Sequence, residues 1–592
     1  MTPYTFKPLA PGDVKLLWST FSQRFEANKN YLASLRTDNL IRAHYMEAGL
    51  WAAPEYVKDI HWGWESPSCQ LRGHFVGHWL WAAAHIYAST GDEEFKARGN
   101  KIVSEIARCQ KENGDNWAGS IPPKYLDWAA RGKYVWAPHY TIHKNMFGLL
   151  EMYKFAGNQQ ALDILVDWSE WFYKWTGQFT QEQMDNLLDV ETGGMLEIWA
   201  DLYGETRDPK HLELLHRYDR RRLFDRLLAG EDVLTNMHAN TTIPEVMGAA
   251  RAWEVTGEDR YRKITEAYWK FAVTDRGYYC TGGQTCGEIW GPNGELSARL
   301  GEKTQEHCTV YHMIRLADYL QRWTGDVACA DYIERNTYNG ILAQQHPETG
   351  MVTYFLPLHG GAQKKWGTPT EDFWCCHGTL VQAHVLHNAY VYYEDAEGLV
   401  VAQFIPTEAA WKWNGVPVKV LQTIDMQKEQ TRRPKNNAFN LTVQAEQPVD
   451  FTLKIRLPWW LKGEATITVN GEKQKIESKQ SSYVSIKRTW KDDKVHVVLP
   501  KGLVAEPLPD LPDTVAFVDG PVVLAGLCDE ERTLIGDKSD PETILTPDCE
   551  RLWGAWQPGY RTINQDRGIR FVPLYSVRDE KYSVYFPVRR KG

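Results

Sequence analysis

The sequence of 592 residues lacks the features that mark membrane, secreted and nucleic-acid-binding proteins. No 18 uncharged apolar residues run together, which argues against a membrane-spanning helix. The start, MTPYTFKPLAPGDVKLLW, has no basic stretch followed by an apolar core and a small-residue cleavage site. Lys and Arg form no long basic run and the net charge is -9, so a polyanion would be repelled. We therefore expect a cytoplasmic protein that binds neither membrane nor nucleic acid.

Two common cysteine and histidine patterns are also absent. The ten cysteines include no repeated CxxC knuckle, and without a secretory signal we expect reduced thiols. A disulfide between the adjacent Cys375 and Cys376 would need a strained eight-membered ring. His139 and His143 are one helical turn apart, but no glutamate stands as in HExxH, which excludes a zincin-type site.

Aromatic residues, in contrast, are abundant. The chain has 26 Trp and 29 Tyr. Aromatic rings stack on the apolar C–H faces of sugars, but they also fill hydrophobic cores. The excess is therefore compatible with a sugar-binding protein without establishing one, and the length predicts two or three domains.

A helix–turn–helix pattern recurs through the first half of the chain. Each copy is an amphipathic segment that ends in Thr or Ala, usually Gly, and then an acid or amide. The glycine suits a left-handed C-cap, and the next residue can begin another helix. The turns centre on Gly91, Gly157, Arg207, Gly257 and Gly325, in steps of 66, 50, 50 and 68 residues. Five helical hairpins predict a closed ring, an (α/α)6 barrel, over residues 1–393.

The pattern changes near residue 395. Short runs of alternating apolar and polar residues, such as VDFTLKIRL and KVHVVLP, predict an antiparallel β-sandwich over residues 394–513. Asn470-Gly471 is a two-residue hairpin signal within it. We expect residues 514–592 to form a β-rich segment, which is either a second sandwich or packs back on the barrel.

Four residues could hold a metal ion. Glu306, Cys308, Cys375 and Cys376 supply one carboxylate and three potential thiolates, a suitable set for a tetrahedral zinc. The two halves of this set lie far apart in the sequence. Buried free thiols therefore remain the alternative, because free cysteine is among the most buried residue types.

Glu288 is the best single candidate for acid–base chemistry. It follows Gly287 in a glycine-rich loop and precedes Ile289 and Trp290. We expect a flexible loop in which partial desolvation could raise the pKa of the Glu288 carboxyl group. A solvated acid without a catalytic role is the alternative.

Eight ordered segments over residues 60–410 resemble those of the bacterial β-L-arabinofuranosidases, and most closely glycoside hydrolase family 146, a relative of family 127. The segments are LRGHFVGHWLWAAAHIYASTGD, WAPHYTIHKNMFGLLEMY, GGMLEIWADLYGETRD, HANTTIPEVMGAAR, TGGQTCGE, EHCTVYHMIRL, YIERNTYNGILAQQHPETGMVTYFLPL and DFWCCHGT.

The resemblance implies an (α/α)6 barrel followed by β-sandwich domains, and a retaining exo-glycoside hydrolase that releases L-arabinofuranose from β-L-arabinofuranosides. It also implies a zinc-bound cysteine as nucleophile. Carried over by position, it makes Cys375 the nucleophile and Glu288 the acid/base, with Zn2+ held by Glu306, Cys308, Cys375 and Cys376.

The resemblance further implies a set of sugar-contacting residues, namely His143, His238, Glu334 and Tyr354, with His139 and Glu197 as weaker additions. The expected partner is a small carbohydrate, and the sequence leaves a homodimer open. Two rival hypotheses remain. One is an (α/α)-barrel hydrolase or lyase on another sugar with only a structural metal, and the other is a non-catalytic carbohydrate-binding protein.

Overall fold

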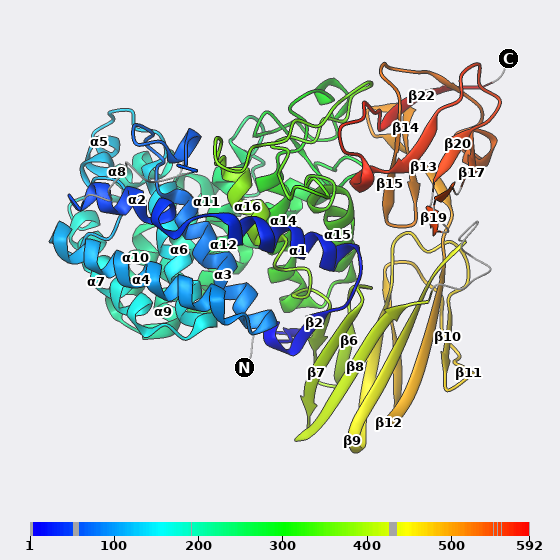
Figure 1. The fold of residues 1–592 in the computed structure, drawn as a ribbon, viewed down its shortest axis with the longest axis horizontal. Helices are drawn as coiled ribbons and strands as arrows, with labels where there is room; N and C mark the ends of the chain where they lie inside the picture. Colours follow the sequence, from blue (N-terminus) through cyan, green and yellow to red (C-terminus); the bar gives the residue numbers. More distant parts are fainter. Residues whose placement is uncertain are drawn as a thin grey trace.

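The computed structural model describes residues 4–50, 59–190, 192–425, 435–548, 550–552, 555–557 and 559–590. A helical part formed by the first two thirds of the chain is followed by a β-rich part beside it (Figure 1). Within the described residues, no helix has both the length and the apolar character needed to cross a membrane.

The α-helices of the described residues are all in the first 383 residues. They are α1 (Thr20–Ser34), α2 (Thr37–Glu47), α3 (His74–Thr90), α4 (Glu93–Asn113), α5 (Lys124–Ala130), α6 (Pro138–Ala156), α7 (Gln159–Thr176), α8 (Gln181–Leu188), α9 (Met195–Thr206), α10 (Pro209–Arg217), α11 (Arg221–Leu228), α12 (Ala239–Thr256), α13 (Asp259–Trp269), α14 (His307–Thr324), α15 (Val327–Asn336) and α16 (Cys375–Ala383).

Six of these helices close an inner ring. Helices α3, α6, α9, α12, α14 and α16 each pack on the next, and α16 packs on α3. Helices α4, α7, α10, α13 and α15 each follow an inner helix and pack against it from outside. The inner helices are apolar nearly all round, as expected for helices covered on every side. The predicted (α/α)6 barrel is therefore confirmed.

The five predicted turns lie between an inner helix and the following outer one. Gly91, Gly157, Gly257 and Gly325 end their helices with φ between 69° and 74°, and Arg207 adopts the same left-handed conformation with φ 58°. In most repeats the next acid or amide side chain accepts a hydrogen bond from the backbone of the following helix. The repeat is thus a chain reversal built from a left-handed C-cap and an N-cap.

The described strands are numbered in chain order. They are β1 (Lys7–Pro8), β2 (Val14–Leu16), β3 (Thr285–Cys286), β4 (Ile289–Trp290), β5 (Tyr392–Glu394), β6 (Gly398–Val401), β7 (Thr407–Trp413), β8 (Val416–Ile424), β9 (Asn436–Leu457), β10 (Thr466–Val469), β11 (Glu472–Lys473), β12 (Ser482–Pro500), β13 (Leu503–Leu508), β14 (Leu511–Asp519), β15 (Val522–Gly526), β16 (Leu534–Ile535), β17 (Leu545–Pro547), β18 (Glu550–Leu552), β19 (Ala555–Gln557), β20 (Tyr560–Thr562), β21 (Arg570–Pro573) and β22 (Tyr585–Arg589).

The first large sheet has the order β1-β5-β6-β9-β12-β10-β11, with β8 on β9, β7 on β8 and β2 on β7. Its pairs are antiparallel except β6 with β9. The turn between β10 and β11 is the predicted Asn470-Gly471 hairpin, with φ 52° and 86° at the two residues. Because β1 and β2 come from the N-terminus, this sheet joins the two ends of the helical part.

The second large sheet has the order β16-β22-β14-β15-β21-β20-β17, with β13 on β14. It packs against the barrel, where the Tyr582 hydroxyl donates to the Pro357 carbonyl of a loop at 2.7 Å and Arg335 of α15 pairs with Glu506 at 3.0 Å. The predicted division of the chain at residues 393 and 513 stays a prediction. Strand β13, which ends at Leu508, pairs with β14 of this second sheet.

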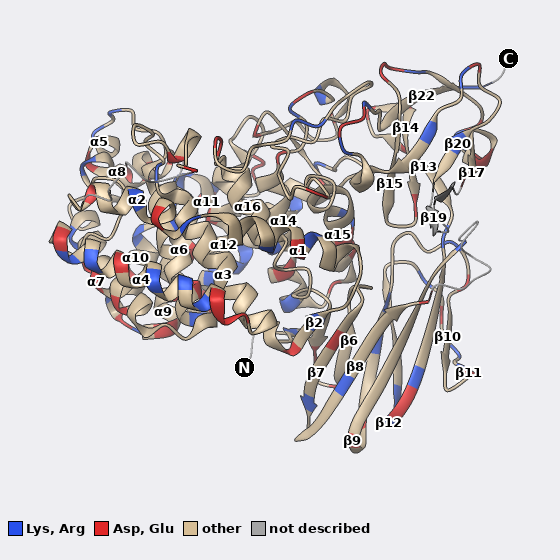
Figure 2. Ribbon diagram, viewed as in Figure 1, with Lys and Arg blue, Asp and Glu red and all other residues tan. Residues whose placement is uncertain are grey.

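Acidic and basic residues are interspersed along the helices and strands in the view of Figure 2. Most inter-helix ion pairs join neighbouring repeats, as Lys210 does with Glu170 at 2.5 Å.

Candidate active site

The N-terminal ends of the inner helices converge on one pocket, with about 410 Å³ of free space including the solvent at its mouth. Four of its lining residues, Tyr140, Asn240, Glu306 and Cys375, lie at the starts of α6, α12, α14 and α16. Its full lining is Trp64, Leu71, Trp136, Ala137, Tyr140, His238, Asn240, Glu288, Glu306, Tyr354 and Cys375. Because helix N-termini carry partial positive charge, this end of the barrel favours anionic groups.

The structure brings together the four predicted metal ligands. Ligand atoms of Glu306, Cys308, Cys375 and Cys376 all lie within 4.8 Å of one another, and all four residues are buried. The Sγ atoms of Cys308 and Cys376 are 3.4 Å apart, and those of Cys375 and Cys376 are 4.0 Å apart. These distances are far beyond a disulfide bond, and the thiols are free. The cluster could therefore bind a metal ion.

Sharp backbone turns hold the two halves of this cluster. Gln305, directly before Glu306, has φ 53°, and Phe373, two residues before Cys375, has φ 49°. A left-handed conformation costs a non-glycine residue about 1–2 kcal/mol. Helix α16 begins immediately afterwards, where the Trp374 backbone N–H donates to His377 Nδ1 at 3.1 Å. Both halves of the cluster are therefore preceded by a left-handed residue that sets the direction of the ligands.

The thiol of Cys375 ionises more readily than those of Cys308 and Cys376. Burial and the neighbouring sulfur atoms raise the pKa values of Cys308 and Cys376 well above their usual range. Burial also opposes ionisation of Cys375, but its hydrogen-bond contacts with Cys308, Cys376 and Tyr354 outweigh burial and hold the Cys375 pKa well below its usual range. The protein groups thus favour one thiolate, and a divalent cation would be needed to ionise all three.

Glu288 lies in a tight hairpin and not in the flexible loop predicted from the sequence. Gly287 and Glu288 form the two-residue turn between β3 and β4, with φ 59° and 71°, the left-handed pair typical of a type I′ turn. The Glu288 carbonyl accepts a hydrogen bond from Ala239 N–H at 2.9 Å, and Gly287 N–H donates to the Lys303 carbonyl at 2.9 Å. The hairpin is therefore fixed on both sides.

The Glu288 carboxylate has two polar neighbours. The Tyr354 hydroxyl donates to it, and His238 Nε2 lies 3.6 Å from Glu288 Oε2. The hydrogen bond from His238, together with that from Tyr354, outweighs burial and lowers the pKa of Glu288. The predicted rise of this pKa is therefore wrong, because its hydrogen-bond partners stabilise the ionised form.

Tyr354 connects the two parts of the site. Its hydroxyl lies 3.3 Å from Cys375 Sγ while it donates to Glu288. Burial and the charge on Cys375 raise the pKa of Tyr354, so the phenol keeps its proton. Cys375 Sγ and the Glu288 carboxylate therefore both contact the same hydroxyl group and lie close to each other.

Two of the six predicted sugar-contacting residues, His238 and Tyr354, line the pocket. His139 and His143 are buried in α6 and are not among the lining residues. His139 Nε2 is 3.1 Å from the Tyr218 hydroxyl. His143 stacks on Phe147, and neither ring nitrogen has a hydrogen-bond partner in the described part of the chain.

Glu197 lies in α9 inside the barrel. Its carboxylate accepts hydrogen bonds from Arg315 at 2.7 Å and from the Tyr319 hydroxyl at 3.1 Å. Burial raises the pKa of Glu197, and the Arg315 cation opposes the rise. The charge of the Glu197 carboxylate is therefore balanced by Arg315 within the protein.

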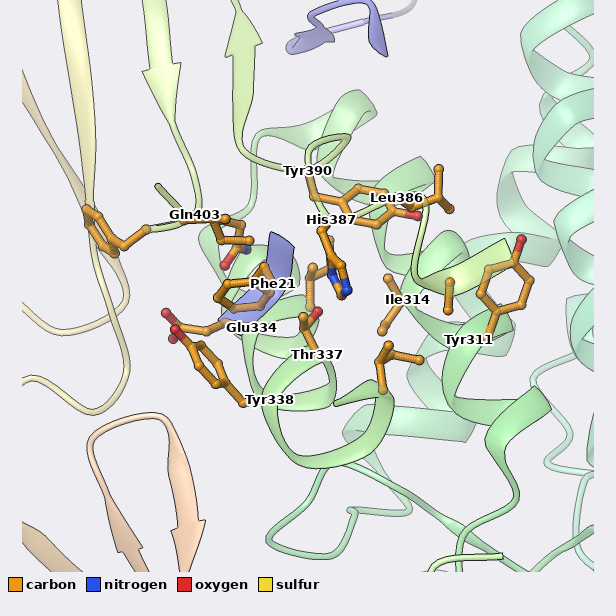
Figure 3. A pocket seen from close by; sticks show the side chains of 15 residues that line it. Phe21, Tyr311, Ile314, Glu334, Thr337, Tyr338, Leu386, His387, Tyr390 and Gln403 are labelled. Carbon is orange, nitrogen blue, oxygen red and sulfur yellow. The ribbon is translucent and has the colours of Figure 1, made fainter. Parts of the chain in front are cut away.

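Glu334 lies in a second cavity, between the helical part and the first large sheet (Figure 3), with about 530 Å³ of free space. Its carboxylate accepts hydrogen bonds from Arg456 at 2.7 Å and from Trp460 Nε1 at 2.8 Å, which lie at the end of β9 and just after it. The structure does not bring Glu334 to the pocket of Cys375 and Glu288.

Sequence reasoning missed Trp64, Trp136, Tyr140 and the pocket-lining role of Asn240. Asn240 Oδ1 is 2.7 Å from His312 Nδ1. All four are within about one turn of an inner helix start or in the loop before it. Position just ahead of each repeated inner helix is the signal that could have found them, because the ring brings those positions together.

Two family models match the chain. The model described as the β-L-arabinofuranosidase GH127 catalytic domain matches residues 13–388, and the model of the GH127 middle domain matches residues 398–501. No curated protein matches the chain.

Solved structures share the whole fold. A structure described as a glycoside hydrolase has a TM-score of 0.75 at 17% identity, covering 99% of this chain and 98% of its own. A GH127 β-L-arabinofuranosidase from Geobacillus stearothermophilus T6 has a TM-score of 0.74 at 17% identity, covering 98% and 100%. A GH127 β-arabinofuranosidase has 0.74 at 18% identity, covering 100% and 99%. At these identities the likeness establishes the fold alone.

Proposed function

Because the chain belongs to the GH127 β-L-arabinofuranosidase family, we propose that it is a retaining exo-glycoside hydrolase that releases L-arabinofuranose from β-L-arabinofuranosides. In this proposal Cys375 is the nucleophile and Glu288 is the acid/base. Glu306, Cys308, Cys375 and Cys376 hold a zinc ion.

The observation that carries the proposal is the shared contact with Tyr354. The hydroxyl reaches both Cys375 Sγ and the Glu288 carboxylate, so the two groups are close. Retaining hydrolases separate nucleophile and acid by about 5–5.5 Å, whereas inverting ones leave about 6.5–9.5 Å for a water molecule. The short span supports attack by the protein on the sugar.

The donor set suits zinc. With Zn–S bonds of about 2.3 Å, the sulfur atoms of a tetrahedral site lie roughly 3.8 Å apart. The Sγ pairs at 3.4 and 4.0 Å and the 3.8 Å between Cys375 Sγ and Glu306 Oε1 are close to this value. Bound zinc would keep the thiols ionised at neutral pH and would stabilise the sulfur of Cys375 as a leaving group.

The first step forms one bond and breaks one. Cys375 Sγ attacks the anomeric carbon, the bond from that carbon to the departing oxygen breaks, and Glu288 gives its proton to this oxygen. The product is a thioglycosyl enzyme with inverted configuration. Since Glu288 must carry a proton in this step, a sugar hydroxyl that takes over the hydrogen bond of His238 would favour it by raising the Glu288 pKa.

The second step reverses these roles. Glu288 takes a proton from water, the water oxygen bonds to the anomeric carbon, and the carbon–sulfur bond breaks to restore the Cys375 thiolate. Two inversions give net retention. Tyr354, which stays protonated, keeps both groups in place throughout.

Sugar contacts are proposed for His238 and Tyr354, which line the pocket. His139, Glu197 and Glu334 already use polar atoms on protein partners. For His143 the sugar contact stays a prediction.

Product analysis tests the mechanism. We expect NMR of the first product formed from an aryl β-L-arabinofuranoside to show the β-anomer, and mass spectrometry of Glu288→Gln with the same substrate to show a pentosyl adduct on the Cys375 peptide. A first product with α configuration would contradict the proposal, as would an adduct on another residue.

Metal analysis separates the remaining alternatives. We expect about one zinc per chain, because four ligands form one tetrahedral site. Zinc with a fully active Cys375→Ser variant would mean a structural metal. Zinc without hydrolysis of any furanoside or pyranoside in a panel of aryl glycosides would favour a carbohydrate-binding protein.

A further inference from the structure

Two tryptophans form one side of the pocket mouth. Trp136 is 36% exposed although it is a large aromatic residue, and Trp64 is half-buried beside it. Their rings meet edge to face with centroids 4.9 Å apart. Both line the same pocket as Cys375 and Glu288. An exposed indole that faces a polar pocket presents an apolar face to whatever enters it.

Hydrogen bonds hold the backbone at both tryptophans, and the two rings contact each other. The backbone N–H of Trp136 donates to the Gln70 side-chain oxygen at 2.7 Å, and that of Trp64 donates to the Asp372 carbonyl at 2.9 Å. Ala137, next to Trp136, has φ 42° where the chain turns into α6. Binding to a preorganised ring costs little conformational entropy.

Depth in the pocket indicates what the ring contacts. Cys375 is 6% exposed and lies at the bottom, whereas the side chains of Glu288 and His238 are 34% and 36% exposed. In the proposed reaction the sugar that is attacked lies at Cys375, and the group that receives the proton lies at Glu288. The leaving group is therefore at the mouth, at the depth of Trp136.

We propose that Trp136, supported by Trp64, is the subsite for the sugar residue of the leaving group, whose apolar C–H face lies on the indole ring. This inference rests on the proposed function. It implies that the natural substrate is an oligosaccharide or glycoconjugate in which a second sugar follows the β-L-arabinofuranose.

The test compares two substrates with Trp136→Ala. For a disaccharide with β-L-arabinofuranose at its non-reducing end, we expect kcat/KM to fall about tenfold, the scale of one aromatic stacking contact. For methyl β-L-arabinofuranoside, which has no second sugar, we expect a change of less than about twofold. Trp136→Phe, which keeps an aromatic face, is expected to recover most of the loss.

Trp18→Ala provides the matched control, because Trp18 is 84% exposed and is not among the pocket residues. Equal losses with both substrates in Trp136→Ala, or no loss with either, would overturn the subsite. If the wild-type enzyme hydrolysed neither substrate, the proposed function itself would be overturned, and the subsite with it.

Discussion

Two of the cavities between described residues contain similar side chains in different electrostatic states. The cavity in Figure 3 and the candidate active site each have a buried or half-buried glutamate, a histidine and tyrosines on their walls. In the first, Glu334 pairs with Arg456, whose side chain is fully buried. In the second, Glu288 contacts a phenol and an imidazole.

This difference separates an acid that stabilises the fold from one that can transfer a proton. A guanidinium partner keeps a carboxylate ionised and fixed, because arginine does not lose its proton in proteins. Glu288 has only the neutral Tyr354 hydroxyl and the His238 ring beside it, and a substrate hydroxyl can replace the His238 contact. Substitutions in the candidate active site should therefore change catalysis, whereas substitution of Glu334 in the other cavity should change stability.

The largest expected effect is that of Cys375→Ser. We expect kcat/KM for an aryl β-L-arabinofuranoside to fall about 10⁴-fold or more, because a serine hydroxyl is not ionised at neutral pH and is a poor nucleophile there. Steady-state kinetics measures this fall in kcat/KM. Cys109→Ser, at a buried free thiol in α4, is the control and should stay within about twofold of wild type. Full activity of Cys375→Ser would exclude the nucleophile assignment.

Glu288→Gln should follow, with a fall in kcat/KM of about 10²–10⁴-fold for an alkyl leaving group, the usual contribution of a general acid. For a nitrophenyl leaving group, which needs little protonation, the fall should be smaller. Glu302→Gln removes an exposed acid of the same segment, paired with Lys365, and should have little effect. An equal fall for both leaving groups would argue against an acid role.

Glu334→Gln should leave catalysis almost unchanged and weaken the fold. Breaking a buried ion pair costs about 3–5 kcal/mol, in this case toward the lower end because Arg456 also pairs with Asp331. We expect a lower urea midpoint with a wild-type kcat at 25 °C. Glu397→Gln, which breaks an exposed pair with Lys454, should cost under about 1 kcal/mol. Loss of kcat without loss of stability would place Glu334 in the catalytic machinery.

The smallest expected effect is a shift in the pH dependence of kcat/KM for His238→Ala. His238 lowers the pKa of Glu288, so its removal should raise that pKa. More enzyme then holds the catalytic proton at a given pH, and the alkaline limb of kcat/KM should move to higher pH. His359→Ala, at a histidine paired with Glu302 outside the pocket, should leave the limb in place. A shift of the limb to lower pH would contradict this effect of His238 on the Glu288 pKa.

The repeated parts of the fold were predictable from the sequence. Each inner helix ends in a left-handed residue, and glycine or its substitute Arg207 marks that position in the chain. The grouping of Glu306, Cys308, Cys375 and Cys376 was predictable for a different reason, since the family resemblance implied it where residue types alone left buried free thiols as the alternative. Both predictions depend on sequence motifs more than on packing.

The features that the sequence did not predict depend on contacts between residues far apart in the chain. The pKa of Glu288 is set by Tyr354 and His238, 66 and 50 residues away, so local desolvation gave the wrong sign. Glu334 was assigned to the sugar by its motif, but its direction is set by Arg456 in β9. No local pattern indicates that Trp64 and Trp136 meet, since their loops become neighbours only when the ring closes.

The pairing of β1 with β5 and of β2 with β7 has a consequence for synthesis on the ribosome. Residues 7–16 are made before their partner strands, which emerge only with residues 392–413. Until then their backbone groups are the open edge of an unfinished sheet, the kind of surface that aggregates or recruits chaperones. The helical ring can therefore form in the order of translation, but its first segment must wait for the sheet that follows it.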